Sequence, residues 1–228
     1  MHNNKNNISI GEQILTSTLW MGAWRWTARI IGFVSIIILA RLLVPSDFGI
    51  VATGMIIVVF FDILIDLGTD SYLIRLSEPD LEDYNTAWTL RLIVVTAASL
   101  AILLAAEPSA AYFGDDRLIK VLQALALANL LRGFTNIGLI MYQREFQFRK
   151  LAIIGLSQRF IGSAATIAFA FYLQSYWAMV FGEVVFRAAE LSLSYVIHPY
   201  RPRLSFTRLD KQWEFCKWIV IRNIANFL

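Results

Sequence analysis

The chain has 228 residues, of which 57% are hydrophobic and 16% are charged, and its mean hydropathy is +0.58. Soluble globular domains carry about 25% charged residues, so this composition excludes an ordinary soluble globule. The single cysteine, Cys216, excludes a disulfide framework within the chain. The formal net charge of +3 comes without a basic stripe clear of the apolar segments. We therefore expect no nucleic-acid partner and interpret the positive charge as a topological signal.

The apolar residues occur in blocks of about 20, the length of a helix that crosses a bilayer. The sequence therefore predicts an all-α, polytopic membrane protein. Six spans are expected in chain order, at residues 19–43, 48–68, 87–106, 118–142, 151–173 and 176–197. A seventh apolar run begins near Trp218, and as a helix its residues would reach only about 16 Å, roughly half of the hydrocarbon core. We expect the chain to be the first part of a longer protein.

The predicted spans divide the chain into a six-helix N-terminal lobe at residues 1–198, a cytoplasmic linker at 199–217 and the start of a seventh helix at 218–228. Lysine and arginine in the connections predict that the N-terminus is cytoplasmic, because cytoplasmic loops carry the excess of these residues. In that orientation the inner segments hold Lys5, Arg75, Arg144, Arg149, Lys150, Arg201, Arg203, Arg208, Lys211 and Lys217, and the outer loops hold only Arg41, Arg117 and Lys120.

Ionisable residues within the first two spans are candidates for function, because each costs about 2.5–3.5 kcal/mol at a helix centre unless it faces protein or water. Arg25 and Arg29 are four residues apart and share one face of the first span, and Asp62 and Asp66 do the same in the second. Since the two helices run antiparallel, Arg25 or Arg29 can pair with Asp62 at a similar depth. Such residues form either a structural ion pair or the polar wall of an internal cavity.

Further arginines follow in the later spans. Arg91 is close to the predicted inner end of its span, so we expect its side chain to reach the headgroups. Arg132 and Arg159 lie deeper, and neither has an acidic residue three or four positions away. The unpaired charge inside the membrane is therefore expected to be cationic. A phosphate or pyrophosphate suits such a cavity, because the guanidinium fork bonds oxyanions through two N–H groups.

The sixth span carries a stripe formed by Glu183, Arg187 and Glu190, at steps of four and three residues. The central arginine can bond to both acids, so the stripe largely neutralises itself. A structural ion-pair role and a functional role remain about equally open for these three residues. Asp66 is expected to have a structural ion-pair role.

Enzyme chemistry has little support in this sequence. No Walker A phosphate loop is present, so the polypeptide is not expected to hydrolyse ATP. His2 lies in the polar N-terminal tail and His198 at a membrane boundary, and with Cys216 they form neither a metal site nor a catalytic triad. We expect no catalytic residues, no metal and no cofactor.

Several motifs resemble the oligosaccharide-lipid flippases of the polysaccharide transporter family, the lipopolysaccharide O-unit flippases. This family is part of the superfamily of multidrug, oligosaccharidyl-lipid and polysaccharide exporters. The segment ARLLVPSDFG at residues 40–49 resembles the family's first outer turn, and RIIG at residues 29–32 resembles the Arg-x-x-Gly of the superfamily's first helix. Other motifs follow in family order at residues 66–68, 112–115, 144–151, 176–178 and 201–206.

The resemblance implies a fold of two similar six-helix lobes with the substrate cavity between them, of which this chain matches the first. It implies a bacterial inner-membrane protein that flips a polyprenyl-pyrophosphate-linked oligosaccharide for lipopolysaccharide or exopolysaccharide synthesis by alternating access. The expected partners are the bilayer, the lipid-linked oligosaccharide and the polysaccharide polymerase and export machinery. In this hypothesis Arg29 and Arg25 contact the pyrophosphate, Asp62 tunes them, and Arg132 and Arg159 add positive potential.

Two alternatives remain open. A multidrug or cation antiporter of the same superfamily would need an acidic site for cationic drugs, whereas the unpaired charge expected here has the opposite sign. The chain can also be a fragment or an assembly partner that transports nothing by itself.

Overall fold

The computed structural model describes residues 10–65 and 67–227, with side chains described for residues 20–64 and 67–219. All regular secondary structure in this part of the chain is helical, which confirms the all-α prediction. The helices are α1 (Ile10–Leu42), α2 (Pro45–Ile65), α3 (Thr69–Arg75), α4 (Leu81–Phe113), α5 (Arg117–Gly133), α6 (Leu139–Arg144), α7 (Phe148–Leu173), α8 (Trp177–Ile197) and α9 (Leu209–Phe227).

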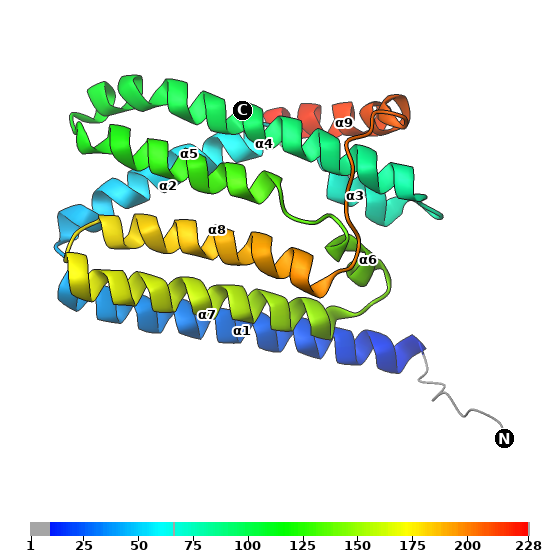
Figure 1. Ribbon diagram of the computed structural model, residues 1–228, viewed down its shortest axis with the longest axis horizontal. Coiled ribbons are helices and arrows are strands. Elements are labelled where there is room, and N and C mark those ends of the chain that lie inside the picture. Colours follow the sequence, from blue (N-terminus) through cyan, green and yellow to red (C-terminus); the bar gives the residue numbers. More distant parts are fainter. Residues whose placement is uncertain (1–9, 66, 228) are drawn as a thin grey trace.

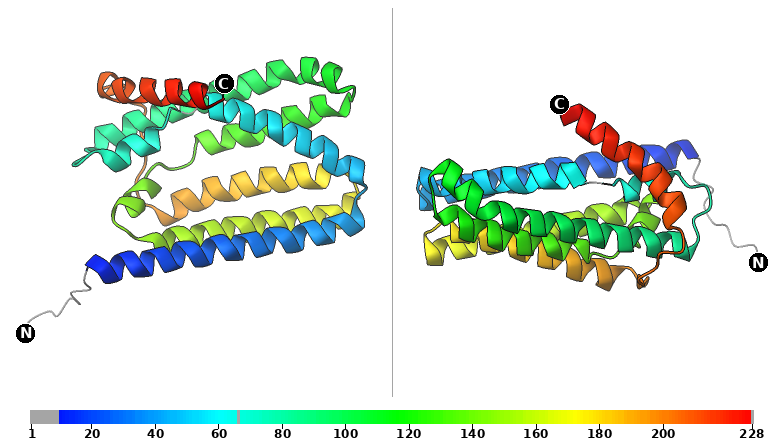
Figure 2. Two further views of the ribbon diagram at one scale, coloured as in Figure 1. Left: turned by 180° about the vertical axis from the view of Figure 1, so that it is seen from behind. Right: turned by 90° about the horizontal axis from the view of Figure 1, so that it is seen from above.

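The long helices lie side by side (Figure 1). Helix α7 packs against both α1 and α8, α8 packs against α5, and α5 packs against α4 and α2. Helix α1 is therefore an outer element that packs mainly against α7. The connections from α1 to α2, from α4 to α5 and from α7 to α8 meet at one end of the molecule, and α3, α6 and the start of α9 lie at the other (Figures 1 and 2).

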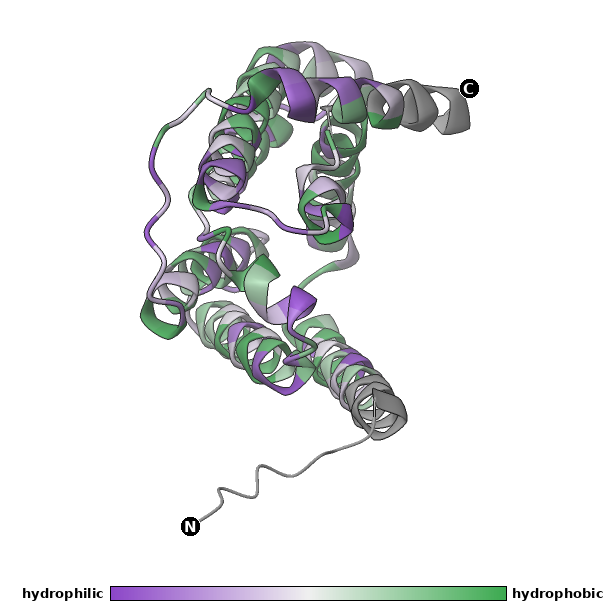
Figure 3. Ribbon diagram, turned by 90° about the vertical axis from the view of Figure 1, so that its right-hand side faces the viewer, coloured by the Kyte–Doolittle hydropathy of each residue, from purple (hydrophilic) through white to green (hydrophobic). Residues whose placement is uncertain are grey.

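Four of the described helices are long and apolar enough to cross a membrane: Trp20–Leu42 of α1, Pro45–Leu64 of α2, the whole of α4 and the whole of α7. Hydrophobic residues are found along all of the long helices (Figure 3). The chain is a polytopic membrane protein. Two expected spans are less clear by these properties, because α5 has only 17 residues and α8 carries three charged side chains.

The fourth expected span, residues 118–142, is not one helix. Helix α5 ends at Gly133, the backbone is irregular to Gly138, and the short helix α6 follows. The prediction missed this interruption because the segment stays apolar on average. The polar and glycine residues of its sequence, Gly-Phe-Thr-Asn-Ile-Gly, are the local signal for a break.

Side chains from two neighbouring helices satisfy the backbone of this break. The carbonyl of Thr135 accepts hydrogen bonds from Trp88 Nε1, at 3.1 Å, and from the Arg91 guanidinium, both on α4. From α8, Ser194 Oγ accepts the N–H of Asn136 at 3.0 Å. Irregular backbone at membrane depth is tolerated only where such partners exist, so α4 and α8 hold the interruption in place.

Helix α4 is longer than the expected span at both ends. It begins at Leu81 behind a capping box, in which Asp80 Oδ1 accepts the N–H of Asp83 and Asp83 Oδ2 accepts the N–H of Asp80. It continues through Pro108 and ends at Phe113, where the capping residue Gly114 has a φ of 70°, in the left-handed region.

The segment between α8 and α9 lies along the first turns of α4. Asn85 Oδ1 accepts the hydroxyl of Tyr200 at 2.7 Å and the N–H of Arg203 at 2.8 Å. Burial raises the pKa of Tyr200 to about 12, so its hydroxyl keeps the proton that it donates. Helix α9 begins at Leu209, earlier than the predicted start near Trp218, and Gln212 Nε2 donates to the carbonyl of Asp83 at 2.8 Å. The start of α9 is thus fastened to α4.

Helices α7 and α8 pack closely against each other at two glycines. A Cβ added at Gly182 would lie 1.8 Å from Thr166 Oγ1, and one added at Gly162 would lie 2.8 Å from Phe186 Cβ. Small residues allow helices to approach closely in membranes.

We predict that Gly182→Val lowers the free energy of unfolding by about 1–3 kcal/mol, because the added atoms must push α8 away from α7. Thermal unfolding of the purified protein in detergent measures the effect. Gly22→Val is the matched control, since a Cβ at Gly22 meets nothing within 4 Å. Equal melting temperatures for the two variants would contradict close packing at Gly182.

Candidate functional site

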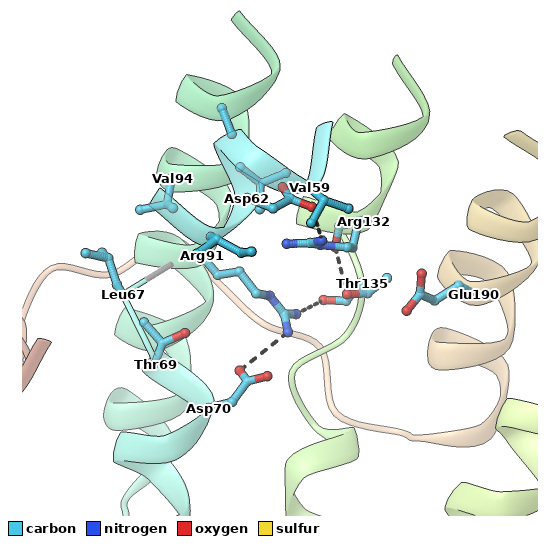
Figure 4. A pocket seen from close by; sticks show the side chains of 13 residues that line it. Val59, Asp62, Leu67, Thr69, Asp70, Arg91, Val94, Arg132, Thr135 and Glu190 are labelled. Carbon is cyan, nitrogen blue, oxygen red and sulfur yellow. Dashed lines mark hydrogen bonds and ion pairs between the residues drawn. The ribbon is translucent and has the colours of Figure 1, made fainter. Parts of the chain in front are cut away.

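A partly open cavity of about 440 Å³ lies among α2, α3, α4, α5, the α5–α6 break and α8 (Figure 4). Its lining is apolar except where five ionisable side chains and two threonines reach it. The ionisable residues are Asp62 of α2, Asp70 of α3, Arg91 of α4, Arg132 of α5 and Glu190 of α8. We call this space the charged cavity.

Asp62 and Arg132 form an ion pair on the wall of the charged cavity. Arg132 Nη1 lies 2.7 Å from Asp62 Oδ2, and Asn129 Nδ2 donates to Asp62 Oδ1 at 3.2 Å. The expected pairing of Asp62 with Arg25 or Arg29 is therefore wrong. Similar depth did not make these residues neighbours, because α2 packs against α4 and α5, whereas α1 packs mainly against α7.

Arg91 points into the charged cavity and does not reach the headgroups as expected. Its guanidinium donates to the Thr135 carbonyl and lies 3.8 Å from Asp70 Oδ1, and its Nε is buried without a hydrogen-bond partner among the described residues. The prediction failed because α4 begins at Leu81. Arg91 therefore lies about 15 Å along the helix from that end, and its guanidinium is engaged by Thr135 and Asp70.

The stripe on α8 forms the contacts that its spacing favours. Arg187 Nε lies 2.8 Å from Glu183 Oε1, and Arg187 Nη1 lies 3.0 Å from Glu190 Oε2. Among these three residues only Glu190 lines the charged cavity. The Arg187 guanidinium therefore pairs with two carboxylates, of which that of Glu190 faces the charged cavity.

The charged cavity does not have the cationic excess that the sequence suggested. Three carboxylates and two guanidinium groups line it, so its formal charge is negative by one. Including the Arg187 and Glu183 side chains behind Glu190 leaves the same excess. Arg132, expected as free positive potential, is neutralised by Asp62.

The unpaired cations lie instead on α1 and α7. Arg25, Arg29 and Arg159 are all exposed, and none of them forms an ion pair with a carboxylate among the described side chains. The Arg29 guanidinium lies over the Trp26 ring, 5.6 Å from its centroid. The Arg159 guanidinium packs on Gly32, where an added Cβ would lie 2.5 Å from Nη2. Arg25, Arg29 and Gly32 follow one another at steps of four and three and so share one face of α1, with Arg159 of α7 lying on Gly32. We call Arg25, Arg29 and Arg159 the arginine ridge.

Several site residues were missed in the sequence. Arg91 was assigned to the surface, and Asp70, Asn129 and Thr135 carried no signal of their own, because their partners are 21 to 67 positions away on other helices. Asp66, a candidate ion-pair residue, lies outside the described residues. In the part of the chain that the structure describes, no group of three or more His, Cys, Asp or Glu side chains is arranged to hold a metal ion.

Three curated relatives resemble the chain at low identity. The succinoglycan biosynthesis transport protein ExoT of Rhizobium meliloti (strain 1021) is 24% identical over 222 residues, which cover 96% of this chain and 43% of that protein. The lipopolysaccharide biosynthesis protein WzxC of Escherichia coli (strain K12) is 22% identical over 225 residues, covering 97% and 46%. An uncharacterized membrane protein in the cps region of Klebsiella pneumoniae is 21% identical over 226 residues, covering 97% and 47%.

The chain thus spans about half the length of the curated relatives that it matches. No solved structure matches it significantly. Residues 38–228 match the family model described as "Polysaccharide biosynthesis protein", which therefore covers α2 to α9 and the end of α1. The chain belongs to this polysaccharide biosynthesis protein family, as its motifs suggested.

Proposed function

We propose that the chain supplies the first lobe of a transporter that moves a polyprenyl-pyrophosphate-linked oligosaccharide across the bacterial inner membrane by alternating access. Family membership and the descriptions of ExoT and WzxC, a transport protein and a lipopolysaccharide biosynthesis protein, support this role. In this proposal α1, α2, α4, α5, α7 and α8 cross the membrane, the N-terminus is cytoplasmic, and α9 begins the second lobe.

The arginine ridge is the observation that carries the proposal. Helices α1 and α7 have no acidic residue after Glu12, yet Arg25, Arg29 and Arg159 lie within their apolar lengths. An unpaired guanidinium at membrane depth is costly against lipid, so these groups must face water, protein or an anionic ligand. Guanidinium forks bind phosphate oxygens through two N–H groups, and three of them together suit a pyrophosphate.

The ridge needs no catalytic step to perform this role. Binding the charged headgroup while the lipid tail stays in the bilayer is sufficient for transport, so we propose neither a cofactor nor an enzymatic reaction. The charged cavity is a poor site for the same anion, because its own carboxylates already exceed its guanidinium groups.

We predict that Arg29→Ala and Arg159→Ala each reduce surface polysaccharide at least tenfold when introduced into the producing bacterium, because each removes a cation that faces the headgroup. Surface polymer is measured with the amount of protein in the membrane verified. Arg41→Ala is the control, since Arg41 is an exposed arginine in the last turn of the same helix. Normal polymer in both variants, or export of cationic drugs instead, would contradict the proposal.

The Asp62–Arg132 ion pair is expected to have a structural role that differs from the role of the arginine ridge. Arg132→Gln alone leaves Asp62 without its charged partner and should lower both thermal stability and transport. The double variant Asp62→Asn/Arg132→Gln leaves no unpaired charge, so it should regain most of the lost stability and transport. Failure of the double variant to recover transport, with stability restored, would show that Arg132 contacts the substrate itself.

A further inference from the structure

Two exposed cations, Arg149 and Lys150, lie at the start of α7, at one boundary of the membrane. The part of α7 that is long and apolar enough to cross the bilayer begins at Phe148, and the first apolar run of the sequence begins at residue 19. The Arg149 guanidinium lies over the Trp20 ring of α1, 5.6 Å from its centroid, so the two apolar lengths begin at the same level. Tryptophan is enriched where lipid headgroups meet the hydrocarbon core, and we therefore place both cations at headgroup level.

Aromatic rings from two different helices hold these cations. Arg149 lies over Trp20 of α1, and Lys150 Nζ lies 4.5 Å from the centroid of the Tyr142 ring on α6 (Figure 1). A cation over a ring face still has N–H groups to donate to a second partner. Neither cation forms an ion pair with a carboxylate among the described side chains. The acid beside them in sequence, Glu145, accepts a hydrogen bond from the side chain of Gln147 instead.

The preceding cation of the same segment is engaged within the protein. The Arg144 guanidinium donates to the carbonyl of Leu76 at 2.6 Å and to that of Ser77 at 3.0 Å, just after α3. Its N–H groups therefore have acceptors in the chain. Arg149 and Lys150 are the pair at this end of α7 whose donors face outward.

The exposed side of α7 continues from these cations as an apolar surface. Arg149, Ile153 and Phe160 follow at steps of four and seven residues and share one face of the helix. Ile153 is 49% exposed and Phe160 is 65% exposed. The helix packs against α1 and α8 through other positions, among them Gly155 and Gly162. A pair of cations at headgroup level thus adjoins a surface suited to acyl chains.

We propose that Arg149 and Lys150 bind the phosphate group of an anionic phospholipid, whose acyl chains lie along Ile153 and Phe160. The guanidinium fork bonds phosphate oxygens through two N–H groups, and the ammonium adds a point charge. A zwitterionic lipid brings its own cation to its phosphate, so two protein cations favour the lipid with a net negative charge. The site is distinct from the arginine ridge, because Arg159 lies ten positions, about 15 Å, further along α7.

The test measures lipid binding to the purified chain in detergent by native mass spectrometry, with phosphatidylglycerol and phosphatidylcholine of identical acyl chains as probes. Two basic groups at headgroup level predict that the chain binds phosphatidylglycerol about tenfold more tightly. The double variant Arg149→Gln/Lys150→Gln should bind the two lipids equally. The matched control is Lys211→Gln/Lys217→Gln, which removes the same charge from exposed lysines of α9 and should keep the preference.

Circular dichroism and the melting temperature verify the fold of each variant. Lys150→Gln alone changes one exposed side chain and leaves Arg149 on its ring, so it should reduce the preference by about threefold even where the double variant melts early. Any of three results would overturn the proposal: equal binding of both lipids by the unaltered chain, an unchanged preference in both Arg149 and Lys150 variants, or loss of the preference in the α9 control.

The same titration separates a lipid site from a general phosphate site. Inorganic phosphate and glycerol 3-phosphate are added as competitors, and neither should displace phosphatidylglycerol at equal concentration, because neither has acyl chains to lie on Ile153 and Phe160. Displacement by inorganic phosphate would contradict the proposal. None of these readouts requires transport, so the inference holds or fails independently of the proposed function.

Discussion

A guanidinium group inside a bilayer needs a carboxylate, a carbonyl or water, and contacts of this kind join several helices of the protein. Left unpaired, such a residue costs about 2.5–3.5 kcal/mol at a helix centre on insertion scales. Arg132 of α5 meets the need with Asp62 of α2, and Arg91 of α4 meets it with the Thr135 carbonyl. These two contacts connect α2, α4, α5 and the α5–α6 break around the charged cavity (Figure 4).

The break and the arginine depend on each other. Interrupting α5 after Gly133 frees backbone carbonyls, and these supply acceptors at a depth where water is scarce. The Thr135 carbonyl takes two donors from α4, and the Phe134 carbonyl accepts the hydroxyl of Tyr195 from α8 at 3.0 Å. A continuous helix would use these carbonyls internally and leave Arg91 without its acceptor. The cavity therefore exists where a helix is broken, as in many membrane proteins that bind polar groups at depth.

Local patterns in the sequence were enough to predict the helical class, the approximate positions of the apolar helices and the contacts of Arg187, because a helix places residues three and four positions apart on one face. Contacts between helices were not predictable in the same way. The number of residues from a helix end gives the depth of a side chain in the membrane, but it does not say which helices are neighbours. Asp62 was therefore assigned the wrong partner. Arg91 was misplaced for a different reason: a polar first turn, Leu81 to Asn85, belongs to the helix that apolar residues alone would start later.

The charges divide between two groups of helices, and this division has a physical consequence. Helices α1 and α7 carry the arginine ridge without a carboxylate partner among the described side chains, whereas α2, α3, α4, α5 and α8 enclose a cavity with one negative charge in excess. An ion pair between an arginine of the ridge and Glu190 would neutralise both, and neither side chain would then carry an unpaired charge for a ligand. Packing keeps them apart instead, since Arg159 is held on Gly32 and Arg187 is held by its own two acids. The exposed guanidinium groups of α1 and α7 therefore stay separate from the carboxylates that line the charged cavity.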